Sequence, residues 1–182
     1  MPMMTLLDEF TPRFDFELRE HMAVEADPGE VYATLAAPDK ALLEVSGKPL
    51  RPRPSVPGFD EVLDGAPWTV LARRPGQEVV FGAAGRFWTP YMDWQRLDRD
   101  TFGGFGGPRR ASLAIAFSVL PYGDSRTLLT FEARATCTDE IAFHWADWYW
   151  HTVKPTARIV MRTVLTRVQL RLNAADPVCE SS

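Results

Sequence analysis

The chain has 182 residues, of which 46% are hydrophobic and 24% are charged, and its formal net charge is −4. This balance predicts a folded protein with a full core and excludes disorder of the whole chain. Acidic and basic residues are mixed without a basic stripe, so a nucleic-acid partner is not expected.

The same features indicate the organisation and the compartment. We expect one soluble domain over residues 1–182, with an ordered core at about 14–173 and flexible tails. The N-terminus lacks a basic segment followed by an apolar one, and no stretch approaches about 18 apolar residues, so neither a signal peptide nor a membrane span is predicted. Two cysteines are too few for a disulfide framework. We therefore expect a cytoplasmic protein.

The first predicted element is a strand. Phe14, Phe16 and Leu18 alternate with polar residues, and the alternation resumes over residues 22–26 after Glu20-His21. A period of two is typical of a half-buried strand. The interruption leaves room for a bulge, so we expect one long first strand with a possible bulge near its middle.

Two short helices are expected next. Asp27 is a suitable N-cap, Pro28 suits the first helical position, and Glu30 stands where a capping box needs it. A second helical piece is predicted over residues 39–45. Residues 48–58 contain four prolines, which favour a stiff, extended connector over a peptide ligand for a proline-reading module.

A run of strands follows, separated by turns that contain glycine and proline. The expected strands are Trp68–Arg73, Glu78–Trp88, Met92–Leu97, Arg110–Pro121 and Ser125–Thr138. Short turns at 74–77 and 121–124 predict antiparallel pairing. Apolar residues line one face of each of the last two strands, namely Leu113, Ile115, Phe117 and Val119, then Leu129, Phe131, Ala133 and Ala135.

The last predicted element is a long helix over about 139–173. Polar residues recur every three or four positions and form one stripe: Glu140, His144, Asp147, His151, Lys154, Arg158 and Arg162. The opposite side, which we expect to meet the sheet, carries Trp145, Tyr149, Val153, Val160 and Val164. Pro155 predicts a kink. Together the elements predict an α+β fold in which a curled antiparallel sheet grips a long C-terminal helix.

This order of elements over residues 14–173 resembles the START-like (SRPBCC) superfamily, whose fold is called the helix-grip. An uncharacterised bacterial branch is similar at Pro75-Gly76-Gln77-Glu78-Val79-Val80, Gly82, Gly85-Arg86-Phe87-Trp88 and Tyr149-Trp150, with Pro155 following. Where those relatives carry Gly-Ser after the proline, this chain has Thr156-Ala157, so no role for a serine is carried over. The resemblance implies a cavity between sheet and helix that holds an apolar small molecule.

Aromatic residues on the strands and the helix are candidates for the lining of such a cavity. The expected lining is Phe81, Phe87, Trp88, Phe117, Phe131, Trp145, Tyr149 and Val153. The expected partner is a lipid or polyketide-like molecule, with no cofactor, and a homodimer is left open. The alternatives are a polyketide cyclase or aromatase that uses the same cavity, or an interaction or stress protein with a vestigial one. Few inward acids or bases are predicted, which favours binding over catalysis without deciding it.

Polar side chains give weaker indications. His144 and His151 stand two helical turns apart, about 10 Å of rise, so we expect a solvated stripe and no metal site. His21 is expected to be structural or exposed. Glu132 and Arg134 share a strand face and are expected to point outward, paired with each other or with a neighbouring strand; in the reverse register they, like Arg86, would face the cavity. The glycine-rich residues 102–108 lack a phosphate-binding lysine and are expected to form a flexible loop at the cavity mouth.

Overall fold

The computed structural model describes residues 4–36 and 57–175. In chain order the elements are α1 (Leu6–Phe10), β1 (Phe16–Val24), α2 (Pro28–Ala36), α3 (Phe59–Gly65), β2 (Thr69–Arg74), β3 (Glu78–Arg86), β4 (Met92–Gln95), α4 (Arg99–Phe102), β5 (Ala111–Tyr122), β6 (Arg126–Cys137) and α5 (Glu140–Ala175). None of the helices in these residues combines the length and apolar character that crossing a membrane requires.

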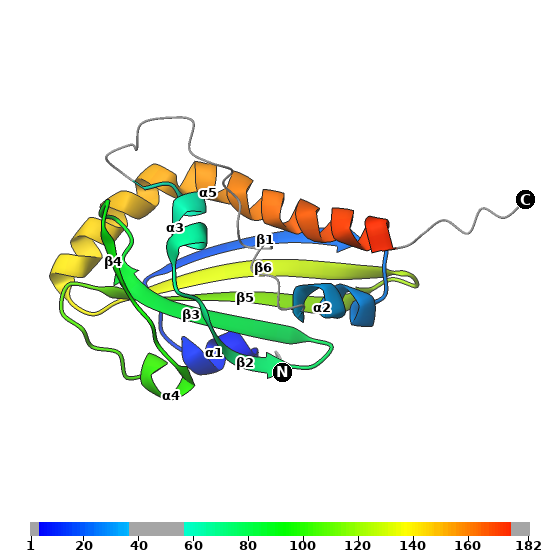
Figure 1. The fold of residues 1–182 in the computed structure, drawn as a ribbon, viewed down its shortest axis with the longest axis horizontal. Coiled ribbons are helices and arrows are strands. Elements are labelled where there is room, and N and C mark those ends of the chain that lie inside the picture. The colour runs from blue at the N-terminus through cyan, green and yellow to red at the C-terminus, as the bar shows by residue number, and fades with distance from the viewer. Residues whose placement is uncertain (1–3, 37–56, 176–182) are drawn as a thin grey trace, which may run out of the picture.

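Within the described residues the strands form an open, antiparallel sheet of six strands in the order β1-β6-β5-β3-β2, and β4 pairs with β3. The long helix α5 runs along one face of this sheet (Figure 1). The predicted fold class, an antiparallel sheet with a long C-terminal helix of the helix-grip kind, is confirmed. The predicted helix at 39–45 and most of the proline-rich connector lie outside the described residues.

Two tight turns set the register of the central strands. At the β2–β3 turn Gly76 has φ of 74°, and the Gln77 amide donates to the Arg74 carbonyl at 2.9 Å. At the β5–β6 turn Gly123 has φ of 72°. Glycine adopts such angles without steric cost, which is why both turns can be short. Both predicted turns are confirmed, although β5 continues to Tyr122 before the second one begins.

The main core lies between the sheet and α5. The inward residues predicted for β5 and β6 are all buried in it, together with Val31 and Leu35 of α2 and Phe59, Val62 and Leu63 of α3. The expected bulge in β1 is wrong, because its pairing with β6 runs without a shift from Phe16 to Val24. Glu20 interrupts the sequence pattern because it takes an inward position that is normally apolar, where arginines of α5 hold its carboxylate.

A second apolar layer covers the other face of the sheet, and the sequence did not predict it. Leu6 and Leu7 of α1 and Phe102 of α4 pack there on small side chains of β3 and β5, opposite α5 (Figure 1). The expected flexible tail is therefore wrong for residues 4–13, and the expected flexible loop at 102–108 begins with a buried phenylalanine. Helices as short as α1, α3 and α4 show too few turns for a periodic signal.

The helix α5 bends in its middle, as Figure 1 shows where the ribbon passes from yellow to orange. Pro155 lies inside the helix. It has no amide hydrogen for the preceding turn, and its ring crowds the carbonyl four residues earlier, so the predicted kink is confirmed. The bend divides α5 into a first half over residues 140–154 and a second half over residues 156–175.

Candidate functional site

Most side chains predicted to line a cavity pack against one another between the sheet and α5. The Phe117 and Phe131 rings stack with centroids 4.5 Å apart, and Phe81 meets Phe117 edge to face at 6.5 Å. A second aromatic group joins Phe87 to Tyr149 at 5.3 Å. Val153 is buried in the same cluster. These residues form one continuous core, in which the aromatic rings are each other's neighbours.

Trp145 is placed differently from the prediction. It was expected to face the sheet, but 53% of the residue is exposed, so that expectation is wrong. The inward positions of the first half of α5 are instead Ala142, Ala146, Tyr149, Trp150 and Val153. Each residue turns about 100° around a helix, so Trp145 lies roughly a quarter turn from its buried neighbour Ala146.

Trp145 takes part in an open pocket beside the first turns of α5, which we call the rim pocket. It has a volume of about 460 Å³ and lies between α5, the β3–β4 connection and the segment before β5. Its lining consists of Arg86, Trp88, Thr89, Pro90, Arg109, Ile141, Ala142, Trp145 and Trp148. Of the eight residues expected to line a cavity, Trp88 and Trp145 line this pocket, whereas the contribution of Trp148 and Arg109 was not predicted.

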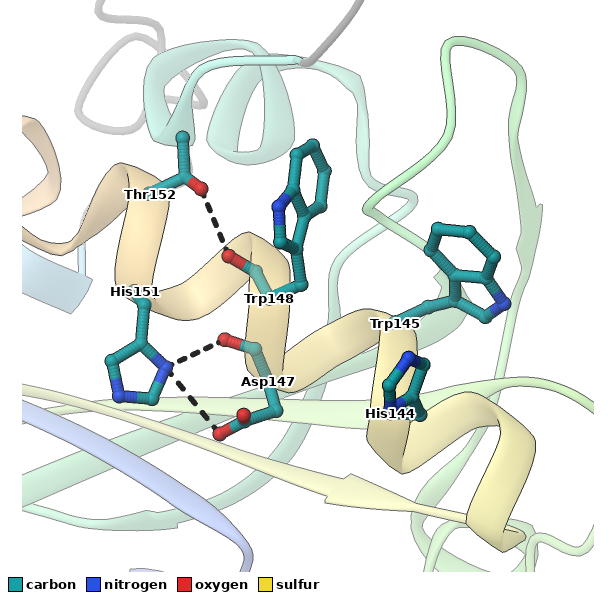
Figure 2. Close-up of a pocket in the computed structure, with 6 residues that line it drawn as sticks. All are labelled: His144, Trp145, Asp147, Trp148, His151 and Thr152. Carbon is teal, nitrogen blue, oxygen red and sulfur yellow. Dashed lines mark hydrogen bonds and ion pairs between the residues drawn. The ribbon is translucent and has the colours of Figure 1, made fainter.

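A second hollow of about 530 Å³ adjoins the rim pocket along α5 and shares Trp145 and Trp148 with it. Figure 2 shows the two indoles on one side of the helix, away from Asp147 and His151. The His151 Nδ1 lies 2.8 Å from the Asp147 carbonyl and 3.4 Å from its carboxylate, so this ring is engaged within its own helix. In residues 4–36 and 57–175 no group of three or more His, Cys, Asp or Glu side chains is arranged to hold a metal ion.

Asp139 connects two walls of the rim pocket, the start of α5 and the segment before β5. Its Oδ1 accepts the Ala142 amide at 2.8 Å and its Oδ2 accepts the Arg109 amide at 2.6 Å. These two hydrogen bonds, in that order, hold the pKa of the Asp139 carboxyl below its ordinary value. Arg109 has φ of 52°, a left-handed angle that is uncommon for a residue other than glycine. One carboxylate thus caps α5 and fixes the backbone that carries Arg109.

Arg86 lies at the end of β3, and the structure directs it to the rim pocket, which answers one question that the sequence left open. Its Nε is 3.9 Å from Asp93 Oδ2, and the same oxygen is in direct contact with the Arg110 guanidinium. The Arg86 Nε is buried, and no group in the described part of the chain accepts its hydrogen. The pocket therefore borders on a cation whose nearest carboxylate is shared with another arginine.

Glu132 and Arg134 face away from the main core, as predicted, and pair with each other at 2.7 Å. Both are nevertheless buried, because α1 covers them and its Asp8 accepts from Arg134 at 2.8 Å. Burial alone would raise the pKa of Glu132, but the hydrogen bond from Arg19 and the charge of Arg134 hold it below its ordinary value. His21 is exposed, as expected, with its Nδ1 2.8 Å from the Thr130 hydroxyl.

Comparisons with known proteins identify the fold. No model of a known protein family matches this chain, and no curated protein is a significant match. A conserved protein from Geobacillus kaustophilus is similar in structure, with 13% identity, a TM-score of 0.53, and coverage of 88% of this chain and 97% of that chain. Protein MLL2253 from Mesorhizobium loti matches with 11% identity, a TM-score of 0.46, and coverage of 89% and 100%. The first similarity shows a shared fold and no more.

Proposed function

We propose that this protein is a START-like protein that binds a hydrophobic small molecule, and that the molecule lies in the rim pocket. The observation that carries the proposal is the exposure of two large aromatic residues, Trp145 at 53% and Trp148 at 50%, on the wall of a concave pocket. Exposed apolar patches of this kind are typical of binding surfaces in proteins that otherwise bury their large apolar side chains.

The size and composition of the pocket support this proposal. Its volume of about 460 Å³ lies within the range of pockets that hold drug-sized molecules. Indole rings offer broad, rigid contact area with little conformational entropy to lose. A ligand that covers about 300 Å² of apolar surface gains roughly 7 kcal/mol before association costs, which corresponds to micromolar affinity at best.

The charged groups of the pocket favour binding over catalysis. Its charged members are Arg86 and Arg109. A guanidinium stays protonated at any physiological pH, whereas general acid–base catalysis needs a group that exchanges protons near neutrality. The pocket is therefore better suited to hold a molecule than to carry out the reactions of a polyketide cyclase or aromatase.

A neutral apolar dye tests the proposal. N-phenyl-1-naphthylamine fluoresces more strongly in an apolar site, and we expect it to bind with a micromolar dissociation constant. Replacing either indole removes one wall, so Trp145→Ala and Trp148→Ala should each weaken binding about fivefold or more, since about 1 kcal/mol of contact is lost. The measurement is a fluorescence titration of the dye with each variant.

The control is Ile159→Ala, which removes an apolar side chain of the second half of α5 that is 65% exposed. This variant should bind the dye as the unmodified protein does. Dye binding that neither tryptophan variant weakens would place the site elsewhere. A loss of equal size in Ile159→Ala would mean that the dye adheres to apolar surface in general, and either result would contradict the proposal.

A further inference from the structure

The arginines of this protein differ in how fully their charges are compensated. Several hold a carboxylate oxygen at hydrogen-bonding distance, between 2.6 and 2.9 Å: Arg19, Arg134, Arg158 and Arg162. The carboxylate closest to Arg86 is that of Asp93, and at 3.9 Å from Nε it is too far for a hydrogen bond. The Arg110 guanidinium already contacts that carboxylate. Arg86 is thus left with a positive charge that its surroundings only partly balance.

The Arg109 guanidinium is in a similar position. Among the described residues it forms no ion pair, and the hydrogen bonds that Asp139 accepts come from the backbone amides of Arg109 and Ala142. The charge of Arg109 acts on Asp139 as the last of the causes that lower its pKa. Both arginines that line the rim pocket therefore retain donors for a further acceptor.

The backbone around these arginines is held in an unusual conformation. Met92, Asp93 and Arg109 have φ between 42° and 52°. Such angles persist in residues other than glycine only where the surroundings impose them, and they concentrate at ligand sites. For Arg109 these surroundings are the hydrogen bond from its own amide to Asp139 and the two hydrogen bonds between Thr138 and Arg110. Arg109 is consequently presented by a fixed backbone and not by a free loop.

From this arrangement we infer that the ligand of the rim pocket is an apolar acid. Its carboxylate lies at the guanidinium groups of Arg86 and Arg109, and its apolar part lies against Trp145 and Trp148. The planar guanidinium is suited to a carboxylate because its donors match the two oxygens in spacing and direction. This inference rests on the proposed function and adds the chemical class of the ligand to it.

A matched pair of probes separates charge from apolar contact. The acid 2-naphthoic acid and its neutral amide, 2-naphthamide, have nearly the same shape and differ at neutral pH by one negative charge. We expect the acid to bind about tenfold more tightly, a difference of about 1.4 kcal/mol. Calorimetric titration at low ionic strength, where charge contacts are least screened, gives both affinities.

Substitution of the arginines assigns that difference to the pocket. Arg86→Gln and Arg109→Gln should each bring the affinity for the acid close to that for the amide, while the amide is bound as before. Arg86→Lys keeps the charge without the planar donors, so its affinity for the acid should lie between those of the unmodified protein and Arg86→Gln. The control Arg126→Gln removes an exposed arginine at the far end of the sheet, next to Tyr122, and should change neither affinity.

The outcomes distinguish this inference from the proposed function. If acid and amide bind equally and Trp145→Ala weakens both, the inference of an acidic ligand is wrong, but the proposed binding of a hydrophobic molecule stands. A preference for the acid that survives both glutamine variants would place the anion elsewhere and overturn the inference as well. Binding of neither probe would overturn both. The melting temperature of each variant should match that of the unmodified protein. If a glutamine variant unfolds, Arg86→Lys tests the inference instead, by whether it weakens binding of the acid.

Discussion

The two halves of α5, on either side of Pro155, differ in their contacts and in the exposure of their side chains. In the second half Arg158 and Arg162 hold the buried Glu20 carboxylate of β1 at 2.6 and 2.9 Å, and the inward side chains are wholly buried: Met161, Val164, Leu165 and Val168. In the first half the inward residues are Ala142, Ala146, Tyr149, Trp150 and Val153, but four other large apolar residues are 43% to 53% exposed: Ile141, Phe143, Trp145 and Trp148.

This difference shows how one helix can both pack firmly on the sheet and expose aromatic side chains to a pocket. The second half runs along the sheet, where apolar side chains and one buried carboxylate hold it. The bend turns the first half away from that line (Figure 1), and there the exposed indoles form walls of the rim pocket. Buried side chains of both halves stabilise the fold, whereas the proposed binding uses the exposed indoles of the first half, so binding and stability are separable by mutation.

A large loss of stability is expected from the buried face of the second half. Leu165→Ala should lower the free energy of unfolding by about 2–5 kcal/mol, because it leaves a cavity in the packed core. Leu170→Ala is the matched control, since the same substitution falls on the same half of the helix where the leucine is 61% exposed; it should change stability by less than about 0.5 kcal/mol. Chemical denaturation measures both free energies of unfolding. Equal losses in the two variants would show that burial on the sheet does not determine which side chains of this half stabilise the fold.

The buried carboxylate gives an intermediate, pH-dependent effect. Burial would raise the pKa of Glu20, but hydrogen bonds from Arg162 and Arg158 outweigh it and hold the pKa below its ordinary value of 4.5. A lowered pKa in the folded state means that this contribution is present above about pH 4.5 and is lost as the pH falls through the folded-state value.

Glu20→Gln should therefore cost about 1–2 kcal/mol at neutral pH, because two charge-assisted hydrogen bonds to partly exposed arginines are lost. The deficit should shrink as the solution is acidified, when the unmodified protein loses the same contribution. Denaturation curves recorded across the acid range measure this. Glu25→Gln, at an exposed glutamate just after β1, serves as control. A deficit independent of pH would exclude the charge as its cause.

The smallest effect on stability is expected for the exposed indoles of the first half. Trp145→Ala should lower the free energy of unfolding by less than about 1 kcal/mol, although it removes the largest kind of side chain, because about half of that residue already contacts solvent. Trp150 lies on the same half of α5 but is buried against the Phe16 ring at 5.3 Å, so Trp150→Ala should cost about 3–5 kcal/mol. Thermal or chemical denaturation of the pair checks this, and similar losses would contradict it.

The sequence predicts the strands well, because alternation of apolar and polar residues is a local signal. The bounds of β3, β5 and β6 fall within two residues of the expected ones. The exception inside β1 is instructive: Glu20 has its charges satisfied by arginines 138 and 142 positions away, and the sequence pattern contains no sign of that pairing. The same holds for Glu132 and Arg134, which are buried only because α1 covers them.

Of the candidate site, the sequence predicts the residue types better than their positions. It indicates Trp88 and Trp145 as ligand contacts, but places Trp145 on the face toward the sheet. Trp148 belongs to neither the polar stripe nor the inward set, and Arg109 precedes a strand in a segment without periodicity, so neither had a signal. The three-dimensional structure brings these residues to one pocket from three separate parts of the chain.

By itself the sequence determined the order of the strands and the long C-terminal helix, the antiparallel pairing across the two short turns, and the position of the kink at Pro155. These features depend on contacts within a few residues, so composition and period suffice to specify them. Which aromatic side chains are buried, and which charges meet, was decided only by the tertiary structure. A step of one residue turns a helical side chain by about 100°, so the rotation of α5 on the sheet separates the exposed Trp145 from the buried Tyr149, and that rotation is set by packing against residues distant in the sequence.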